Sequence, residues 1–257
     1  MIKVRQNLRK VATIALCLAG SATMFAQETG VKIGNTTWAT RNVDMPGTFA
    51  ENSWDAGMFY QWNSTTAYPA TGTVTGWNSS WNGGFETPSE NDKWTNNICP
   101  EGWTLPTTAQ IDELLTFKGN LADNWIQQYG VQGRQFVDGD NVLFFPATGI
   151  RLATSGNLSS VGERGTYWSA EAGGANSARF LQFYSNEASR YGDDRARGYC
   201  VRCVKEGNVG INTISVDTEN AVVTGYFDML GRQLQEEPKQ GFYIIRYSNG
   251  TAKKVMR

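Results

Sequence analysis

Apolar and polar residues alternate in short runs along much of the chain, and this period of two predicts β-strands. Residues 31–45 predict a hairpin: Val31 and Ile33 share one face, Gly34-Asn35 turns the chain, and Trp38 begins the return strand. The earliest part of the folded chain is therefore expected to be a small antiparallel pair.

A second hairpin is predicted around Asp138-Gly139-Asp140-Asn141, because Asp-Gly favours a tight turn between apolar runs. Its two carboxylates suggest calcium as an alternative, but the loop is much shorter than a twelve-residue calcium loop and lacks the terminal Glu. A turn is therefore the preferred interpretation. The strands of this hairpin and three later strands are predicted at residues 134–137, 142–145, 167–170, 178–184 and 198–204, with a polar loop over 186–197.

One helix is predicted after Thr107, which stands at the N-cap with Gln110 at the capping-box position. Its buried stripe is Ile111, Leu114 and Leu115, at helical spacing. We therefore expect a short amphipathic helix that packs on a sheet.

A second helix is predicted over residues 121–129, where Leu121, Trp125 and Tyr129 recur every four residues and form its buried face. In contrast, residues 46–98 show almost no periodicity and are rich in aromatic and small polar residues. Trp-Asn occurs there three times at unequal spacings, which indicates biased composition and not a structural repeat.

The N-terminal segment predicts export. Basic residues precede an apolar run that begins at Val11 and ends at Ala26, as in a secretory signal peptide. We assign residues 1–26 to this signal, with cleavage after Ala22 as an alternative. The run is too short for a comfortable membrane span, and Cys17 lacks the small preceding residue of a lipoprotein signal. We therefore expect no membrane span in the mature chain and an extracellular or cell-surface location.

The chain changes character after Glu206. We predict a central domain over residues 27–206 and a small all-β domain, with a sandwich-like arrangement, over residues 207–257. The strands of this second domain contain no Trp or Cys and are predicted at residues 214–216, 221–227, 241–247 and 253–256.

Charge disfavours nucleic acid as a partner. The chain has a formal charge of −1, and removal of the signal, which carries four positive charges and no negative ones, lowers it to −5. The only basic cluster is Lys253-Lys254 with Arg257. Such a mildly acidic protein offers no electrostatic footprint for nucleic acid or anionic lipid.

The residue types also argue against catalysis. The chain contains no histidine, the usual general base and the commonest transition-metal ligand. Glu51 and Asp55 flank Trp54, and Asp193-Asp194 lie in a polar stretch, but none forms a recognisable acid pair. We therefore expect no enzyme, no cofactor and no metal site, and a carboxylate-dependent hydrolase is the least favoured hypothesis.

Three cysteines follow the predicted signal: Cys99, Cys200 and Cys203. Export to an oxidising compartment predicts one disulfide and one remaining thiol. Cys200-x-x-Cys203 matches a redox motif, but that motif opens a helix after a strand. The residues that follow here are typical of a strand end, so redox catalysis is disfavoured.

Five motifs in a fixed order resemble the Fibrobacter succinogenes major paralogous domain (FISUMP) family, a group of exported bacterial domains related to C-type-lectin-like and sulfatase-modifying-factor folds. The resemblance covers roughly residues 29–206. The motifs are Val31-x-Ile33-Gly34-x-x-x-Trp38, Cys99-Pro100-x-Gly102-Trp103-x-Leu105-Pro106, Phe145-Pro146-Ala147-x-Gly149, Tyr167-Trp168-Ser169 and Val201-Arg202-Cys203-Val204.

This resemblance implies an α+β, C-type-lectin-like fold with two helices, small antiparallel sheets, long irregular loops and paired first and last strands. It also implies a Cys99–Cys203 disulfide, whereas Cys200 departs from the family pattern. Residues three apart in a strand point to opposite faces, so Cys200 should not compete for Cys99. The calcium and sugar motifs of C-type lectins are absent from the sequence.

The C-terminal residues resemble the sorting domain of the type IX secretion system of Bacteroidetes. This resemblance implies contact with the secretion machinery and delivery to the cell surface or medium. Its motifs are Tyr226-Phe-Asp-Met-Leu-Gly231-Arg, Gly241-Phe-Tyr-Ile-Ile-Arg and Asn249-Gly-x-x-Lys253-Lys254-Val.

The leading functional hypothesis is a surface binding or adhesion module for a glycan or a surface protein. Aromatic rings stack on the CH faces of sugars, and polar side chains bind the hydroxyls. The alternative is a structural or assembly subunit, with the tryptophans in the core or pinning the loops. The candidate ligand-binding residues are Trp54, Trp62, Trp77, Trp81, Asn78, Asn82, Arg190, Tyr191, Asp193 and Asp194.

Overall fold

The computed structural model describes residues 28–206, 222–228, 231–248 and 252–256. The predicted signal segment and the predicted strand at residues 214–216 lie outside these ranges. Up to residue 206 the elements are, in chain order, β1 (Val31–Ile33), β2 (Thr36–Trp38), β3 (Tyr60–Gln61), β4 (Trp103–Thr104), α1 (Thr108–Thr116), β5 (Trp125–Gln128), β6 (Val131–Asp138), β7 (Asn141–Pro146), β8 (Ile150–Arg151), β9 (Leu158–Ser159), β10 (Gly165–Gly174), β11 (Ser177–Phe183), β12 (Ala188–Asp194), β13 (Gly198–Tyr199) and β14 (Val204–Lys205).

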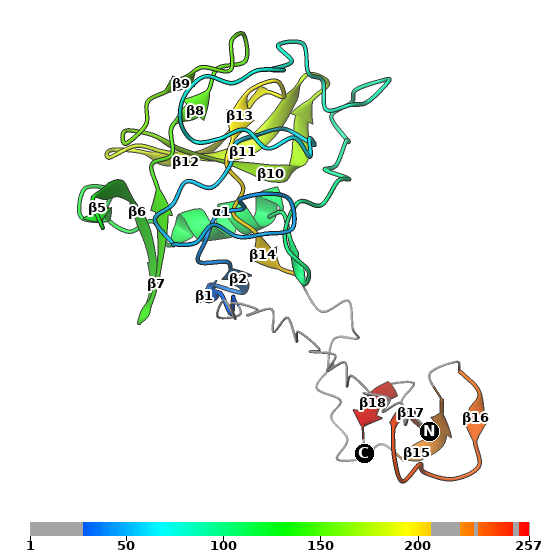
Figure 1. Ribbon diagram of the computed structural model, residues 1–257. Coiled ribbons are helices and arrows are strands. Elements are labelled where there is room, and N and C mark those ends of the chain that lie inside the picture. The colour runs from blue at the N-terminus through cyan, green and yellow to red at the C-terminus, as the bar shows by residue number, and fades with distance from the viewer. Residues whose placement is uncertain (1–27, 207–221, 229–230, 249–251, 257) are drawn as a thin grey trace, which may run out of the picture.

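The described part of the chain is nearly all β, with α1 as its one helix. Between residues 28 and 206 the strands form four small antiparallel sheets, ordered β1-β2-β14-β4, β3-β13-β8-β9, β5-β6-β7 and β10-β11-β12. Helix α1 runs across one face of the β10-β11-β12 sheet (Figure 1). The predicted two-helix α+β, C-type-lectin-like fold class is therefore wrong.

Helix α1 itself begins as its sequence predicts. The Thr107 side chain accepts a hydrogen bond from the Gln110 N–H, and the Gln110 side chain accepts one from the Thr107 N–H. Within the helix, the side chains of Ile111 and Leu114 are buried. A reciprocal cap of this kind satisfies two backbone donors that a helix N-terminus otherwise leaves free.

The second predicted helix does not form. Residues 125–128 make strand β5, which pairs with β6 from Trp125↔Arg134 to Gln128↔Val131. Tyr129 and Gly130 form the two-residue turn between them, with φ of 50° and 84°. The spacing of apolar residues in this segment also fits a helix, but pairing with β6 satisfies the backbone and decides the outcome.

The C-terminal half of the central domain also differs from expectation. Residues 188–194, which lie in the predicted polar loop, form strand β12, paired with β11 along its length. The predicted strand at 198–204 is instead two short strands, β13 and β14, in different sheets. The chain crosses from one sheet to another between them, so no single strand can continue.

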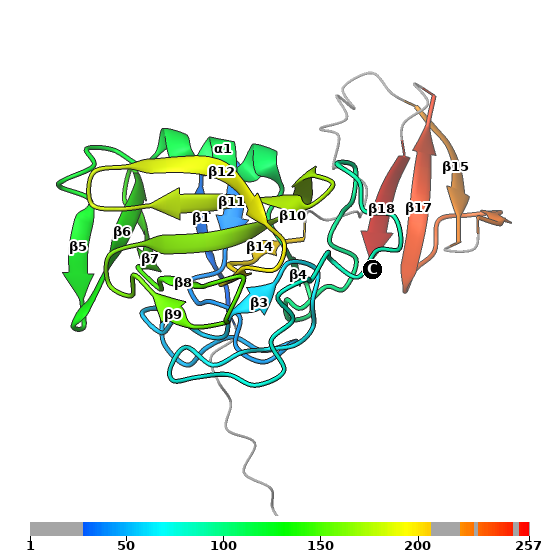
Figure 2. The ribbon, with the colours of Figure 1, turned by 90° about the horizontal axis from the view of Figure 1, so that it is seen from above.

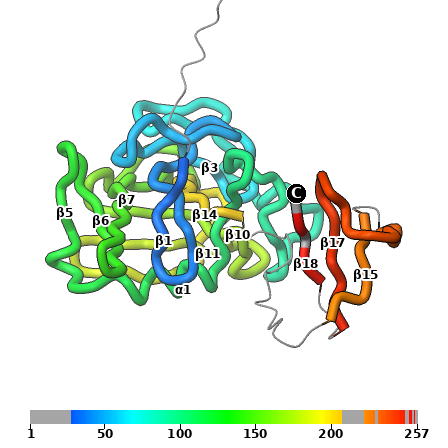
Figure 3. Tube along the Cα trace, turned by 90° about the horizontal axis from the view of Figure 1, so that it is seen from below, coloured from blue at the N-terminus to red at the C-terminus, as the bar shows by residue number. Residues whose placement is uncertain are grey.

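The implied pairing of the first and last strands is not what this sheet shows: β1 pairs with β2, and the last strand of the domain, β14, pairs with β2 and β4. Val204 on β14 lies between Trp38 on β2 and Thr104 on β4, so the end of the domain closes the sheet that its beginning starts. Strand β1 lies beside β7 (Figure 3). The turn after β1 is held from the side, because the Gly34 N–H donates to Asp138 at 3.0 Å.

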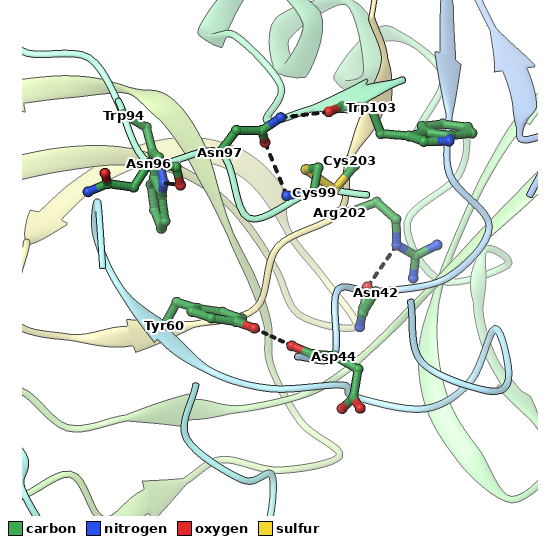
Figure 4. Close-up of a disulfide and its surroundings, with 10 residues drawn as sticks. All are labelled: Asn42, Asp44, Tyr60, Trp94, Asn96, Asn97, Cys99, Trp103, Arg202 and Cys203. Carbon is green, nitrogen blue, oxygen red and sulfur yellow. Dashed lines mark hydrogen bonds between the residues drawn. A yellow bond between two sulfur atoms is a disulfide. The ribbon is translucent and has the colours of Figure 1, made fainter. Parts of the chain in front are cut away.

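The Cys99–Cys203 disulfide is confirmed, with a Cα–Cα distance of 6.1 Å (Figure 4). It closes a loop of sequence separation 104, for which chain entropy alone gives an upper value of about 4–5 kcal/mol. Cys200 is a buried thiol in a different core cluster from the two bonded cysteines. Burial raises its pKa to about 12, so it is protonated and unreactive at neutral pH.

Four fully buried arginines fasten segments that lack regular structure: Arg134, Arg151, Arg195 and Arg202. Arg202 illustrates the arrangement, and its Nε donates to Asn42 at 2.7 Å (Figure 4). Another nitrogen donates to the Thr40 carbonyl at 2.7 Å, and the guanidinium lies over the Phe145 ring at 4.5 Å. Burial lowers the pKa of Arg202 to about 10, so the group remains a cation at neutral pH.

The C-terminal unit is one four-stranded antiparallel sheet in its described residues, ordered β16-β15-β17-β18. The predicted sandwich-like arrangement is not observed there. Tyr243 is its fully buried side chain, and Phe242 is more than half exposed. The strands are β15 (Val223–Phe227), β16 (Gln233–Leu234), β17 (Phe242–Tyr247) and β18 (Ala252–Met256).

Candidate functional site

Residues 46–98 form long loops around the short strand β3, and much of this stretch lies on the side of the domain away from α1 (Figure 2). We call this part the loop segment. Despite its irregular backbone it contains fully buried side chains, among them Phe59, Tyr60 and Trp62. The Trp62 indole N–H donates to the Ser169 carbonyl at 3.0 Å, so this tryptophan belongs to the core and not to a ligand surface.

Trp77 is also turned inward. Its ring packs on Tyr68 with centroids 4.7 Å apart, and its indole N–H donates to the Ala153 carbonyl at 2.8 Å. Two glycines make room for it: a Cβ at Gly156 or Gly198 would lie 2.8 or 2.7 Å from the ring. Trp77 therefore holds the loop segment against the β8–β9 region.

Asn63 is the node that joins separate stretches of the loop segment. Its φ is 63°, a left-handed conformation that Asn tolerates better than most residues. Its side-chain amide donates to the Gly83 carbonyl at 2.8 Å and accepts from the Thr95 N–H at 2.8 Å. The Asn96 amide donates back to the Asn63 carbonyl at 3.1 Å.

A pocket of about 280 Å³ opens beside this node. We call it the Trp81 pocket. It contains one partly exposed tryptophan, and none of its lining residues carries a charge at neutral pH. The lining residues are Gln61, Asn63, Ser64, Thr65, Thr66, Tyr68, Gly76, Asn78, Trp81 and Asn96.

The walls of the Trp81 pocket are fixed by hydrogen bonds to the backbone. The Trp81 indole N–H donates to the Trp62 carbonyl at 2.7 Å, and the Tyr68 hydroxyl donates to the Gly76 carbonyl at 3.1 Å. The Gln61 amide donates to the Asn78 carbonyl at 2.7 Å. Burial raises the pKa of Tyr68, so its hydroxyl is protonated. The pocket is therefore preformed, uncharged and rich in amide and hydroxyl groups.

Arg195 packs against Trp62, whose carbonyl binds the Trp81 indole, and the sequence did not predict this role. The guanidinium stacks on Trp62 at 4.6 Å, and its nitrogens donate to Asp92 at 2.7 Å, to the Ser89 carbonyl at 2.7 Å and to the Asn82 carbonyl at 3.0 Å. The only sequence signal was an arginine in a polar stretch, which usually indicates a solvated surface.

The other candidates are engaged in structural contacts. Asn82 binds within its own turn, donating to the Phe85 carbonyl and accepting from the Gly84 N–H. Trp54 lies outside the Trp81 pocket and stacks on Tyr129. Of the four candidate tryptophans, only Trp81 lines this pocket, with Asn78 as its predicted companion.

The four candidates on β12 face their own neighbours and not the Trp81 pocket. Arg190 forms a two-pronged ion pair with Asp112. The remaining contacts are local: the Tyr191 hydroxyl donates to Glu187, Asp193 accepts from Tyr199 and pairs with Arg197, and Asp194 accepts from the Ala196 N–H.

A cavity of about 560 Å³ lies near the disulfide and includes Glu28, Asp44, Glu51 and Glu101. The Glu28 carboxylate in this cavity already accepts hydrogen bonds from Thr40 and Arg41. Burial alone raises the pKa of Glu28, but hydrogen bonds from Arg41 and Thr40 lower it below the usual value. In the described residues no three acidic or cysteine side chains converge as a metal site would require.

Comparison with family models, with curated proteins and with solved structures found no match to this chain. The resemblances to the FISUMP family and to a type IX sorting domain therefore rest on sequence motifs alone. In the described residues no helix has the length and apolar character needed to cross a bilayer.

Proposed function

We propose that this chain is an exported, non-catalytic binding protein whose Trp81 pocket holds a sugar ring of a neutral glycan. The observation that carries the proposal is the combination of one accessible tryptophan with uncharged amide and hydroxyl groups in a single rigid pocket. A sugar presents CH faces to an aromatic ring and hydroxyls to groups that both donate and accept hydrogen bonds. Amide and hydroxyl side chains do both.

The size of the Trp81 pocket supports a small unit of a larger ligand. Its volume of about 280 Å³ lies just below the range of about 300–1,000 Å³ typical of pockets that enclose drug-sized ligands. A chain end or a single side branch of a polysaccharide would fit such a pocket, with the remaining sugars outside. Export through residues 1–26 and surface delivery through residues 207–257 complete this proposal.

The first test measures binding of neutral hexasaccharides (cellohexaose, xylohexaose, mannohexaose and maltohexaose) to the full secreted chain by calorimetry. We expect Trp81→Ala to weaken binding of the preferred sugar at least about tenfold, equivalent to about 1.4 kcal/mol. Because no lining residue is charged, the affinity should be nearly the same at about 50 and about 500 mM salt.

Two controls make this test decisive. Asn157→Ala changes an exposed asparagine outside the pocket, and it should leave binding unchanged. Trp81→Phe keeps an aromatic face but loses the indole donor to the Trp62 carbonyl, and it should retain part of the affinity. Equal binding by wild type and Trp81→Ala would contradict the proposal. Failure to bind sugar combined with self-assembly would favour the structural alternative.

A further inference from the structure

Tyr129 occupies a position that its own backbone disfavours. The turn between β5 and β6 consists of Tyr129 and Gly130, both with positive φ. Such a turn favours Asn-Gly, because Asn and Gly adopt the left-handed conformation at little cost and a tyrosine does not. A residue that a turn disfavours requires a compensating contact or a role of its own.

The contact is an aromatic stack. The centroids of the Tyr129 and Trp54 rings lie 3.9 Å apart, and the interplanar angle is 34°. Tyr129 nevertheless remains 74% exposed, so most of its surface is open to solvent. Trp54 is held in place from its own loop, because Asp55 accepts from the Asn52 N–H at 2.9 Å and the Asn42 amide donates to the Asp55 carbonyl at 3.2 Å.

A pocket of about 440 Å³ lies next to this pair. Ser53 and Gln128, which line it, directly precede Trp54 and Tyr129 in the chain. As in the Trp81 pocket, none of the lining residues is charged, and three are glutamines. The lining residues are Thr40, Ser53, Ile126, Gln127, Gln128, Gln135, Val142, Leu143 and Phe144.

We propose that the Trp54–Tyr129 stack and the adjoining glutamine pocket form a second saccharide site, separate from the Trp81 pocket. A sugar ring stacks on the open face of Tyr129, and the next sugar places its hydroxyls against the glutamine side chains and the Ser53 hydroxyl. The inference rests on the proposed function for its ligand class only. Amides and hydroxyls match a ligand made of hydroxyls, and the absence of charged side chains in the lining favours a neutral one.

The substitution Tyr129→Asn tests this site. It removes the aromatic ring that stacks on Trp54, and it places at this position a residue that tolerates positive φ better. Tyr129→Asn restores the preferred turn sequence, so the thermal midpoint should not fall. Calorimetry with the same four hexasaccharides should show at least a tenfold loss of affinity at this site. Tyr129→Phe keeps the ring and should bind within about threefold of wild type. Val161→Asn, which alters another exposed apolar residue of the same domain, should change nothing.

The outcomes separate the two sites. If Tyr129→Asn binds every hexasaccharide as wild type does, the second site is overturned even when Trp81→Ala loses binding. If Trp81→Ala binds normally and Tyr129→Asn does not, the Trp81 proposal fails and this one stands. An exposed aromatic pair can also accept a proline-rich peptide. Binding of decaproline in place of sugar, abolished by Tyr129→Asn, would overturn the saccharide assignment.

Discussion

Two regions of the central domain satisfy their buried backbone groups by different means. In the hairpin region, strands β5–β7 and β10–β12, backbone groups pair with neighbouring strands in long registers. In the loop segment, residues 46–98, side chains satisfy the backbone instead. Arg151 shows this most clearly: its guanidinium donates to carbonyls of the loop segment at Pro69, Thr71 and Gly72 and to that of Gly156.

The loop segment has a biased, aperiodic sequence that nevertheless encodes a specific structure. Buried carbonyls require partners wherever the chain runs, and irregular backbone cannot supply all of them. In the loop segment the partners are indole N–H groups, amides and guanidinium groups, each at one position. Polar substitutions that are harmless on the strands of a hairpin should therefore be costly in the loop segment.

The largest expected effect is at Arg195. Arg195→Met leaves a mostly buried Asp92 without its partner and several carbonyls without donors, so the free energy of unfolding should fall by about 3–5 kcal/mol. Arg190→Met removes an exposed ion pair on β12 and should cost less than about 1 kcal/mol. Urea unfolding of both variants measures the difference. Similar losses of unfolding free energy in the two variants would contradict the proposed difference between the regions.

Two residues with a left-handed backbone conformation, one in each region, allow a second test of the difference between the regions. Gly139, in the hairpin turn, and Asn63, in the loop segment, have φ of 60° and 63°. Gly139→Ala should cost about 1–2 kcal/mol, from backbone strain alone, because no neighbouring atom lies within 4 Å of the new Cβ. Asn63→Ala replaces a residue that already bears a Cβ, so its main cost is the loss of hydrogen-bond partners for Gly83 and Thr95, about 1–3 kcal/mol. A loss well below about 1 kcal/mol in thermal unfolding would show that these hydrogen bonds contribute little.

The smallest expected effect is the pH dependence of the stability contributed by Glu171, which lies where the two regions meet. Glu171 on β10 accepts hydrogen bonds from Lys93 of the loop segment and from Thr108 at the start of α1. Its burial by itself raises the pKa, but these hydrogen bonds outweigh it and lower the pKa to about 2 from the usual 4.5. Because the folded pKa is depressed, the stabilisation is complete above about pH 4.5 and is lost as pH falls toward 2.

Lys93 is largely exposed, so this contribution should stay below about 1 kcal/mol. The measurement is the stability difference between wild type and Glu171→Gln from pH 7 to pH 2. The difference should be constant above about pH 5 and shrink below it. A Glu171 difference that does not change with pH would contradict the assignment.

Local signals predicted the elements that local interactions determine. The Thr107 cap, the Gly34-Asn35 turn and the Asp138–Asn141 turn are formed by residues within a few positions of one another, and each is present. The helix at residues 121–129 failed because its spacing was compatible with two structures and a distant strand chose between them. The Cys99–Cys203 bond followed from motif positions in a family resemblance.

The candidate site was only partly visible in the sequence. Composition pointed to the Trp-Asn pairs, and Trp81 with Asn78 does line an uncharged pocket. Sequence could not separate Trp81 from Trp62 and Trp77, because their burial depends on contacts with residues far away in the chain. Tyr129 was assigned to the buried face of a helix, so its exposure depended on the same β5–β6 pairing that sequence missed.

Strand β14 is the third strand in its sheet by position but the last one synthesised. A chain that leaves a ribosome or a translocation pore N-terminus first holds β2 and β4 without the strand between them until residue 205 has emerged. Cys203, two residues before that point, delays covalent closure in the same way. Closure of this sheet therefore waits for the last residues of the central domain, and a chain stopped before residue 204 lacks the strand that joins β2 to β4.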